Sequence, residues 1–218
     1  MHPLLPLALA LAGTPDAAAP DAASVAAAPA LAVAEPRPDH RGWRHALGLG
    51  PHSTTFFSKE GSQYTFHSAS FGYLGSLGAR GPFLHAFALV PLQARQDGHV
   101  YSTANYYRRR EGGDLLLGWQ WRWSVRSDLE AEAGPGLHGT LIYLPGKAGY
   151  RDFSALPLGL GAGAVLRWET RAQRFSRTVT VGTYASAAYD FSDPLHAYDL
   201  SHGFTFRAGL VVGLGACR

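Results

Sequence analysis

Residues 114–126, DLLLGWQWRWSVR, repeat their side-chain character with a period of two. Every second residue from Leu115 to Val125 is apolar, and three of these are the tryptophans Trp119, Trp121 and Trp123. A strand places alternate residues on opposite faces, whereas a helix would mix the two sets. A soluble sandwich strand also alternates, but three tryptophans on one face suit a surface that meets lipid near the headgroups. The segment therefore predicts a membrane-spanning strand.

Seven further segments carry the same alternation and bring the predicted strand number to eight. The segment Phe83–Ala94 is apolar on both faces, and the first segment has Pro51 in its middle, which edges and bulges tolerate. The eight predicted strands are Arg44–Phe57, Gln63–Ala79, Phe83–Ala94, Asp114–Arg126, Leu129–Tyr143, Leu156–Trp168, Thr178–Phe191 and Gly203–Ala216. We expect an outward apolar face that includes Leu115, Trp119, Trp121, Trp123, Leu158, Leu160, Leu210 and Val212.

The connections between these strands largely alternate in length. Short turns are expected at Arg80–Pro82 and Arg126–Asp128, whereas Arg95–Gly113 and Asp190–His202 form long connections. Outer-membrane barrels have short periplasmic turns and longer outside loops, and an even strand number puts both termini on the periplasmic side.

With these strands and connections, residues Trp43–Cys217 resemble the small eight-stranded outer-membrane β-barrels. The resemblance implies an all-β, eight-stranded antiparallel up-and-down transmembrane β-barrel in the outer membrane of a Gram-negative cell. Members of that superfamily commonly end on an aromatic residue that serves in assembly, whereas this chain ends Gly-Ala-Cys-Arg.

The N-terminal residues are expected to lie outside the fold. Leu4–Ala12 has the length of a signal-peptide core and is too short to span a bilayer, which needs about 20 residues. We expect a signal peptide at 1–19, with cleavage as late as residue 34, an Ala/Pro-rich disordered linker at 20–42 and the barrel at 43–218. A disordered tail without export is the alternative. No cysteine follows the apolar core, so a lipoprotein anchor is not expected.

The polar faces of the strands predict a charged lumen. If the strands join tightly around residue 127, Val125 faces Leu129, Arg122 faces Glu132 and Ser124 faces Glu130. The predicted lumen network consists of Arg122, Arg126, Glu130, Glu132, Arg167 and Glu169, with Gln120 and Arg207 also inside. One interpretation of this network is a gate or proton path. The other is a structural plug of salt bridges, since buried charges need partners in any protein. An eight-stranded barrel has an interior that side chains can fill, so an open pore is not expected.

A basic-aromatic cluster, Tyr106–Arg110, lies in the longest predicted loop. Its arginines, Arg108, Arg109 and Arg110, are candidates for contacts with lipopolysaccharide phosphates, and a solvated loop is the alternative. A nucleic-acid site is not expected, because the chain's other charges are scattered and its formal net charge is only +3.

The ten histidines and one cysteine suggest no metal site, cofactor or disulfide. His52 and Thr54 share a strand face, but the sequence places no carboxylate beside them. Barrel-type lipid A deacylases use a His-x-Ser pair, which this chain lacks; Ser201 and His202, with Asp199 nearby, form only a weak triad candidate that reads better as a polar loop.

The sequence therefore predicts a non-enzymatic outer-membrane barrel without an open pore. It would act as an envelope anchor, an adhesion or partner-binding surface, or a component of an envelope assembly. Its expected partners are outer-membrane lipid, including lipopolysaccharide, and other envelope proteins. A lipid-modifying outer-membrane enzyme is the first alternative. A secreted soluble barrel for a small apolar ligand is the second, and the outward Trp, Leu and Phe residues count against it.

Overall fold

The computed structural model describes residues 42–170, 179–195 and 199–214. Eight long strands dominate: β1 Trp43–Ser58, β2 Gln63–Leu77, β3 Arg80–Gln96, β5 Glu111–Arg126, β6 Leu129–Leu144, β8 Leu158–Thr170, β9 Val179–Ser192 and β10 Leu200–Leu214. Three short elements accompany them: β4 His99–Ser102, α1 Thr103–Tyr106 and β7 Phe153–Ala155. The predictions for the signal peptide, for the linker up to residue 41, for the connection at 171–176 and for residues 215–218 lie outside the described residues.

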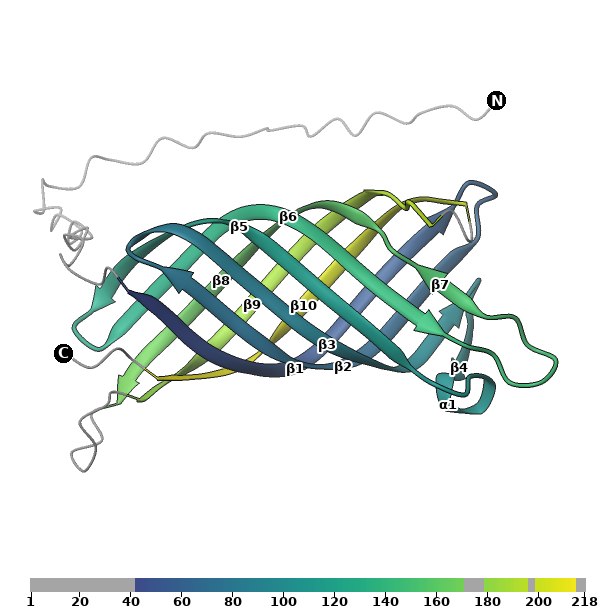
Figure 1. The fold of residues 1–218 in the computed structure, drawn as a ribbon, viewed down its shortest axis with the longest axis horizontal. Coiled ribbons are helices and arrows are strands. Elements are labelled where there is room, and N and C mark those ends of the chain that lie inside the picture. The colour runs from purple at the N-terminus through teal and green to yellow at the C-terminus, as the bar shows by residue number, and fades with distance from the viewer. Residues whose placement is uncertain (1–41, 171–178, 196–198, 215–218) are drawn as a thin grey trace, which may run out of the picture. The chain divides into compact units, whose positions relative to one another are not determined.

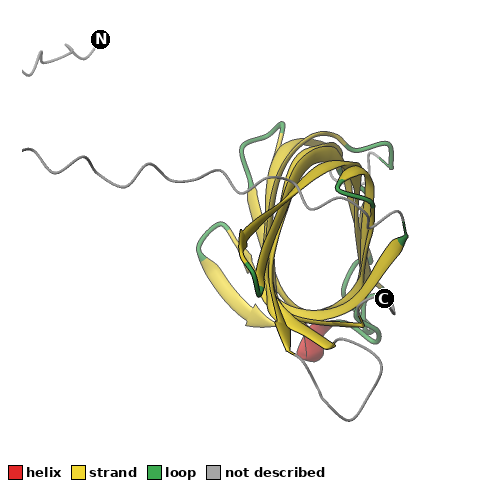
Figure 2. Ribbon diagram, turned by 90° about the vertical axis from the view of Figure 1, so that its left-hand side faces the viewer, coloured by secondary structure: helices red, strands yellow, loops and turns green. Residues whose placement is uncertain are grey.

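The eight long strands form a closed antiparallel barrel (Figures 1 and 2). Each strand pairs with its neighbours in the order β2-β1-β10-β9-β8-β6-β5-β3, and β2 also pairs with β3, which closes the ring. β4 and β7 lie off this ring, paired to β3 and β6. The predicted eight-stranded up-and-down barrel is confirmed, and closure leaves the long strands without a free edge.

The two ends of the barrel differ. Only two residues separate β2 from β3, and only two separate β5 from β6; we call this end the turn end. The other end carries the connections that contain β4, α1 and β7, which project past the long strands in Figure 1; we call it the loop end. The only helix among the described residues, α1, has four residues, so no helix there is long and apolar enough to cross a membrane.

The distribution of side chains is the reverse of that in a soluble protein. All eight residues predicted to face outward are exposed, including Trp119 (53%), Leu160 (57%) and Leu210 (58%). Charged residues such as Arg122, Glu132 and Arg207 are buried inside. An apolar exterior around a polar interior is the pattern of a membrane-spanning barrel, because only lipid makes exposure of so many large apolar side chains favourable.

Two local features differ from the prediction, and the predicted strand through Pro51 is confirmed. The β2–β3 turn comes earlier than expected, at residues 78–79, because Gly78 adopts a positive φ of 63° that suits a tight turn. A bulge at the turn end pairs Arg126, rather than Val125, with Leu129. β1 runs through Pro51, and Pro51 lies opposite Ala69 of β2. On the other side of β1, the pairing with β10 passes from Leu49 to His52 without Pro51. Proline has no N–H to donate to a neighbouring strand.

Candidate functional site

The lumen near the turn end holds a charged cluster that we call the turn-end network: Arg44, Arg122, Glu130, Glu132 and Arg167. Arg122 lies directly opposite Glu132, and Ser124 lies opposite Glu130, as the hairpin register predicted. The Arg122 Nε donates to Glu132 Oε1 at 2.7 Å, and an Arg167 terminal nitrogen lies 3.4 Å from Glu132 Oε2. One buried carboxylate therefore serves two guanidinium groups.

A third ion pair of this network crosses the lumen. Arg44 of β1 donates to Glu130 of β6, and these strands lie four positions apart in the ring of eight. The side chains of both residues are buried. The bridge therefore ties opposite walls of the barrel together and leaves little room for an axial path between them.

The remaining two residues of the predicted lumen network lie elsewhere. The Arg126 side chain is 66% exposed, and its Nε lies 3.8 Å from Asp128 Oδ1, because the bulge rotates this part of β5 out of the regular alternation. Glu169 is half-buried near the turn end of β8 and takes part in no recorded ion pair with the described residues. Four of the six predicted residues thus belong to the cluster, and Arg44 joins them.

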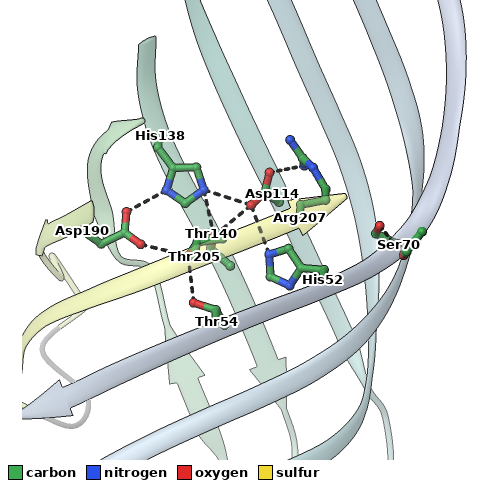
Figure 3. A network of polar contacts seen from close by, with 10 residues as sticks. His52, Thr54, Ser70, Asp114, His138, Thr140, Asp190, Thr205 and Arg207 are labelled. Carbon is green, nitrogen blue, oxygen red and sulfur yellow. Dashed lines mark hydrogen bonds and ion pairs between the residues drawn. The ribbon is translucent and has the colours of Figure 1, made fainter. Parts of the chain in front are cut away.

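A second charged cluster, the middle network, lies further toward the loop end: His52, Asp114, His138, Asp190 and Arg207 (Figure 3). His138 Nδ1 lies 2.7 Å from Asp190 Oδ1, and His138 Nε2 lies 2.9 Å from Asp114 Oδ2. Each ring nitrogen of His138 thus has a buried carboxylate within hydrogen-bonding distance.

A glycine makes the His138–Asp190 contact possible. His138, Gly159 and Asp190 lie in one row across β6, β8 and β9. The middle position has no side chain, so the outer two residues meet across it.

Arg207 closes this network from the opposite wall. It donates to Asp114 across four positions of the strand ring, and its guanidinium carbon lies 3.9 Å from the centre of the Phe87 ring. His52, directly opposite Arg207 in register, places Nε2 3.2 Å from Asp114 Oδ2. Asp114 thus accepts from three basic side chains, and Thr140 Oγ1 adds a contact at 3.2 Å.

Apolar layers separate and close these networks. A buried cluster that includes Leu74, Phe87, Val165 and Tyr184 lies between the two charged layers. At the loop end lies the loop-end cluster: Phe56, Phe66, Ala94, Ile142, Leu144, Phe153, Ala155 and Leu200. The side chains inside the barrel thus form alternating charged and apolar layers.

The middle network was missed from the sequence, although part of its signal was present. The hairpin register that pairs Arg122 with Glu132 also places Asp114 opposite Thr140, one inward position from His138. Extending that register along the two strands would have placed Asp114 beside His138, whereas the contact of Asp114 with His52 of β1 depends on closing the barrel. The contribution of Arg207 from the far wall has no such local signal.

The basic loop residues lie at the loop end, as expected. Arg108 and Arg109 are exposed, and Arg110 is half-buried. The Arg108 backbone nitrogen donates to the Pro145 carbonyl oxygen at 2.8 Å, which fixes this loop to the neighbouring one. The position suits anion contacts outside the barrel.

The weak triad candidate forms only in part. Ser201 Oγ lies 2.9 Å from His202 Nδ1, but Asp199 lies beside Lys59, with 3.6 Å between its Oδ1 and the lysine Nζ. The His202 ring stacks on Phe57 with 4.7 Å between centroids. No carboxylate is recorded orienting the imidazole among the described residues. Within that same part of the chain, no group of three or more His, Cys, Asp or Glu residues has the arrangement of a metal site.

Comparison with solved structures finds a protein of similar size and fold. No family model matches the chain, and no curated protein matches it. The crystal structure of Neisserial surface protein A aligns with 78% of this chain and 98% of its own, at 11% sequence identity and a TM-score of 0.45. This level of likeness assigns no functional residue.

Proposed function

We propose that this protein is an outer-membrane β-barrel of a Gram-negative envelope that anchors a binding surface at its loop end and conducts no large solutes. The observation that carries the proposal is a lumen crossed by buried ion pairs inside an apolar exterior. Two cross-lumen ion pairs, Arg44–Glu130 and Arg207–Asp114, and the loop-end cluster occupy the space that a pore would need. The exterior excludes the soluble ligand-binding alternative, because a soluble barrel would expose polar side chains to water.

Conductance in planar lipid bilayers tests the closed lumen. Purified wild-type protein is expected to insert without a large steady conductance, because displacing a paired buried charge leaves its partner unpaired. A stable conductance on the scale of a general porin would refute the proposal. Fractionation of the producing cells tests the location, and recovery in the soluble periplasmic fraction would contradict it.

A lipid-modifying activity is the second candidate, and the Ser201–His202 hydrogen bond is the observation that favours it. Lipid A from cells that produce wild type or Ser201→Ala is compared by mass spectrometry. We expect identical lipid A from both strains, because Asp199 pairs with Lys59 and does not orient the imidazole. A change in acyl chains that requires Ser201 would establish the enzyme instead.

A further inference from the structure

The loop end carries a cavity of about 360 Å³ between the ends of β2 and β3 and the loop residues that follow α1 and β6. Its wall includes five tyrosines and one arginine: Tyr64, Tyr101, Tyr106, Tyr107, Tyr150 and Arg151. Small-molecule sites typically measure about 300–1,000 Å³ and combine aromatic walls with a few polar groups. The volume suits a ligand of one or two sugar rings rather than a long chain.

The wall is held by a two-residue hairpin turn and by contacts between loops. β3 and β4 join through Asp97 and Gly98, both with positive φ (46° and 92°), the conformation of a tight hairpin turn. The Asp97 carboxylate accepts from the Gln63 backbone nitrogen at 2.8 Å, which ties the hairpin to β2. Thr103 Oγ1 donates to the Pro91 carbonyl oxygen at 2.6 Å and fixes the start of α1.

α1 and the residue after it are also fixed to the loop between β6 and β7. The Lys147 backbone nitrogen donates to the Tyr106 carbonyl oxygen at 2.9 Å, and Lys147 Nζ donates to the Ala104 carbonyl oxygen at 2.8 Å. Tyr107 forms a β-bridge with Gly146. A wall that is ordered before binding reduces the entropy cost of binding.

The tyrosine rings form adjoining walls that meet near right angles. The Tyr106 ring lies 5.1 Å from that of Tyr101 at 74°, and 4.9 Å from that of Tyr150 at 82°. Behind them, Tyr64 packs on Phe153 at 5.9 Å, and Phe153 belongs to the loop-end cluster. The cavity thus has aromatic walls and a base that is continuous with the plug of the barrel.

The polar groups and charges of this region select the ligand's chemistry. Burial raises the pKa of the Tyr101 hydroxyl above its ordinary value, so it stays protonated, and it hydrogen-bonds to Tyr107. Residues 95–111 and 145–153 together contain six Lys or Arg residues and three Asp or Glu residues. This excess of positive charge disfavours a quaternary ammonium ligand, which aromatic cages otherwise bind. A purely apolar ligand would displace water from the tyrosine hydroxyls and leave them without hydrogen-bond partners, which is unfavourable.

We infer that this cavity, named here the tyrosine pocket, binds an acidic saccharide, with its sugar ring against the tyrosine faces and its acid group on Arg151. The C–H bonds of a sugar ring match the electron-rich face of a phenol, and sugar hydroxyls match phenol hydroxyls. A guanidinium binds a carboxylate or phosphate through charge-assisted hydrogen bonds. The inference rests on the proposed function, since it names what the loop-end surface recognises.

Calorimetry on the folded, full-length barrel in detergent tests the tyrosine pocket, with a glucuronic-acid disaccharide and its neutral methyl ester as probes. We expect the acid to bind at least tenfold more tightly than the ester, and Arg151→Gln to remove that preference. Tyr106→Ala is expected to abolish binding of both probes. Arg80→Gln at the turn end and Tyr143→Ala on the exterior are the controls, expected to bind as wild type does.

Equal binding of the acid by wild type, Arg151→Gln and Tyr106→Ala would overturn the inference, as would tighter binding of choline than of the acid. No binding at millimolar probe would also overturn it. A heat-dependent shift in electrophoretic mobility checks that each variant is folded. The calorimetry is done in detergent, whereas the conductance is measured in a lipid bilayer. A failure to bind the saccharide therefore leaves the conductance test of the proposed function unaffected.

Purified lipopolysaccharide distinguishes two sources of the saccharide. If it displaces the disaccharide from wild type, the pocket recognises the membrane's own glycolipid. If it does not, the ligand is a soluble or foreign saccharide with the same acid group.

Discussion

Replacing Glu132 by alanine is expected to destabilise the barrel more than any change at an exposed charge. Glu132 is buried and accepts from Arg122 at 2.7 Å, and it lies 3.4 Å from both Arg167 and Gln120. Breaking a buried ion pair by removing one partner costs about 3–5 kcal/mol. Two arginines lose their partner here, and among the described residues only Arg122 keeps a further side-chain hydrogen bond, to Ser76 at 2.9 Å. We therefore expect Glu132→Ala to lower the free energy of unfolding by about 4–5 kcal/mol, the upper half of that range.

Urea unfolding in lipid vesicles, followed by tryptophan fluorescence, measures this loss. The chain has five tryptophans, and all five are exposed on the outer face of the barrel: Trp43, Trp119, Trp121, Trp123 and Trp168. Their emission is expected to shift to the red as the barrel leaves the bilayer.

Two matched variants separate the lost charge from the lost side-chain volume. Glu132→Gln keeps the shape and removes the charge, so it is expected to be destabilised by a smaller amount. Asp128→Ala breaks the exposed pair with Arg126 on the same hairpin and is expected to cost at most about 1 kcal/mol. The reasoning is refuted if Glu132→Ala loses no more stability than Asp128→Ala.

Three further variants test other parts of the barrel in the same unfolding assay. His138→Ala removes the donor shared by Asp114 and Asp190 and is expected to cost about 3 kcal/mol or more; a loss below about 1 kcal/mol would show that the middle network is not coupled. Leu160→Arg puts a charge on the lipid face and is expected to cost about 2–4 kcal/mol, whereas an unchanged stability would contradict a membrane-embedded exterior. Gly118→Ala places a Cβ 2.0 Å from the Pro135 carbonyl oxygen and is expected to lower the free energy of unfolding by about 1–3 kcal/mol. In the control Gly113→Ala the added Cβ meets nothing closer than 3.7 Å, and equal effects of the two variants would refute the packing argument.

The hairpin of β5 and β6 was predictable from the sequence because its information is local. The two-residue period assigned the faces, and the short connection fixed which residues lie opposite each other. Arg122 therefore met Glu132 as expected. The bulge at Val125 was not predictable, because the two-residue period continues through Val125 and gives no local signal of an extra residue.

The additions at the loop end were also outside the reach of periodicity. β4 and β7 have four and three residues, too short for an alternation to stand out, and α1 has a single turn. They are held by contacts between two loops, which the sequence alone does not bring together. The tyrosine pocket depends on those contacts and was seen in the sequence only as the separate cluster Tyr106–Arg110.

The sequence by itself determined the strand number, the inward and outward faces and the pairing of neighbours across short turns, since each of these follows from a period of two and a connection length. Only the tertiary structure decided which charges meet across the lumen. Arg44 reaches Glu130, and Arg207 reaches Asp114, from strands four positions away in the ring. Closing the ring at a particular register sets the height of each side chain along the axis, and that height decides which charge on one wall can meet a charge on the opposite wall.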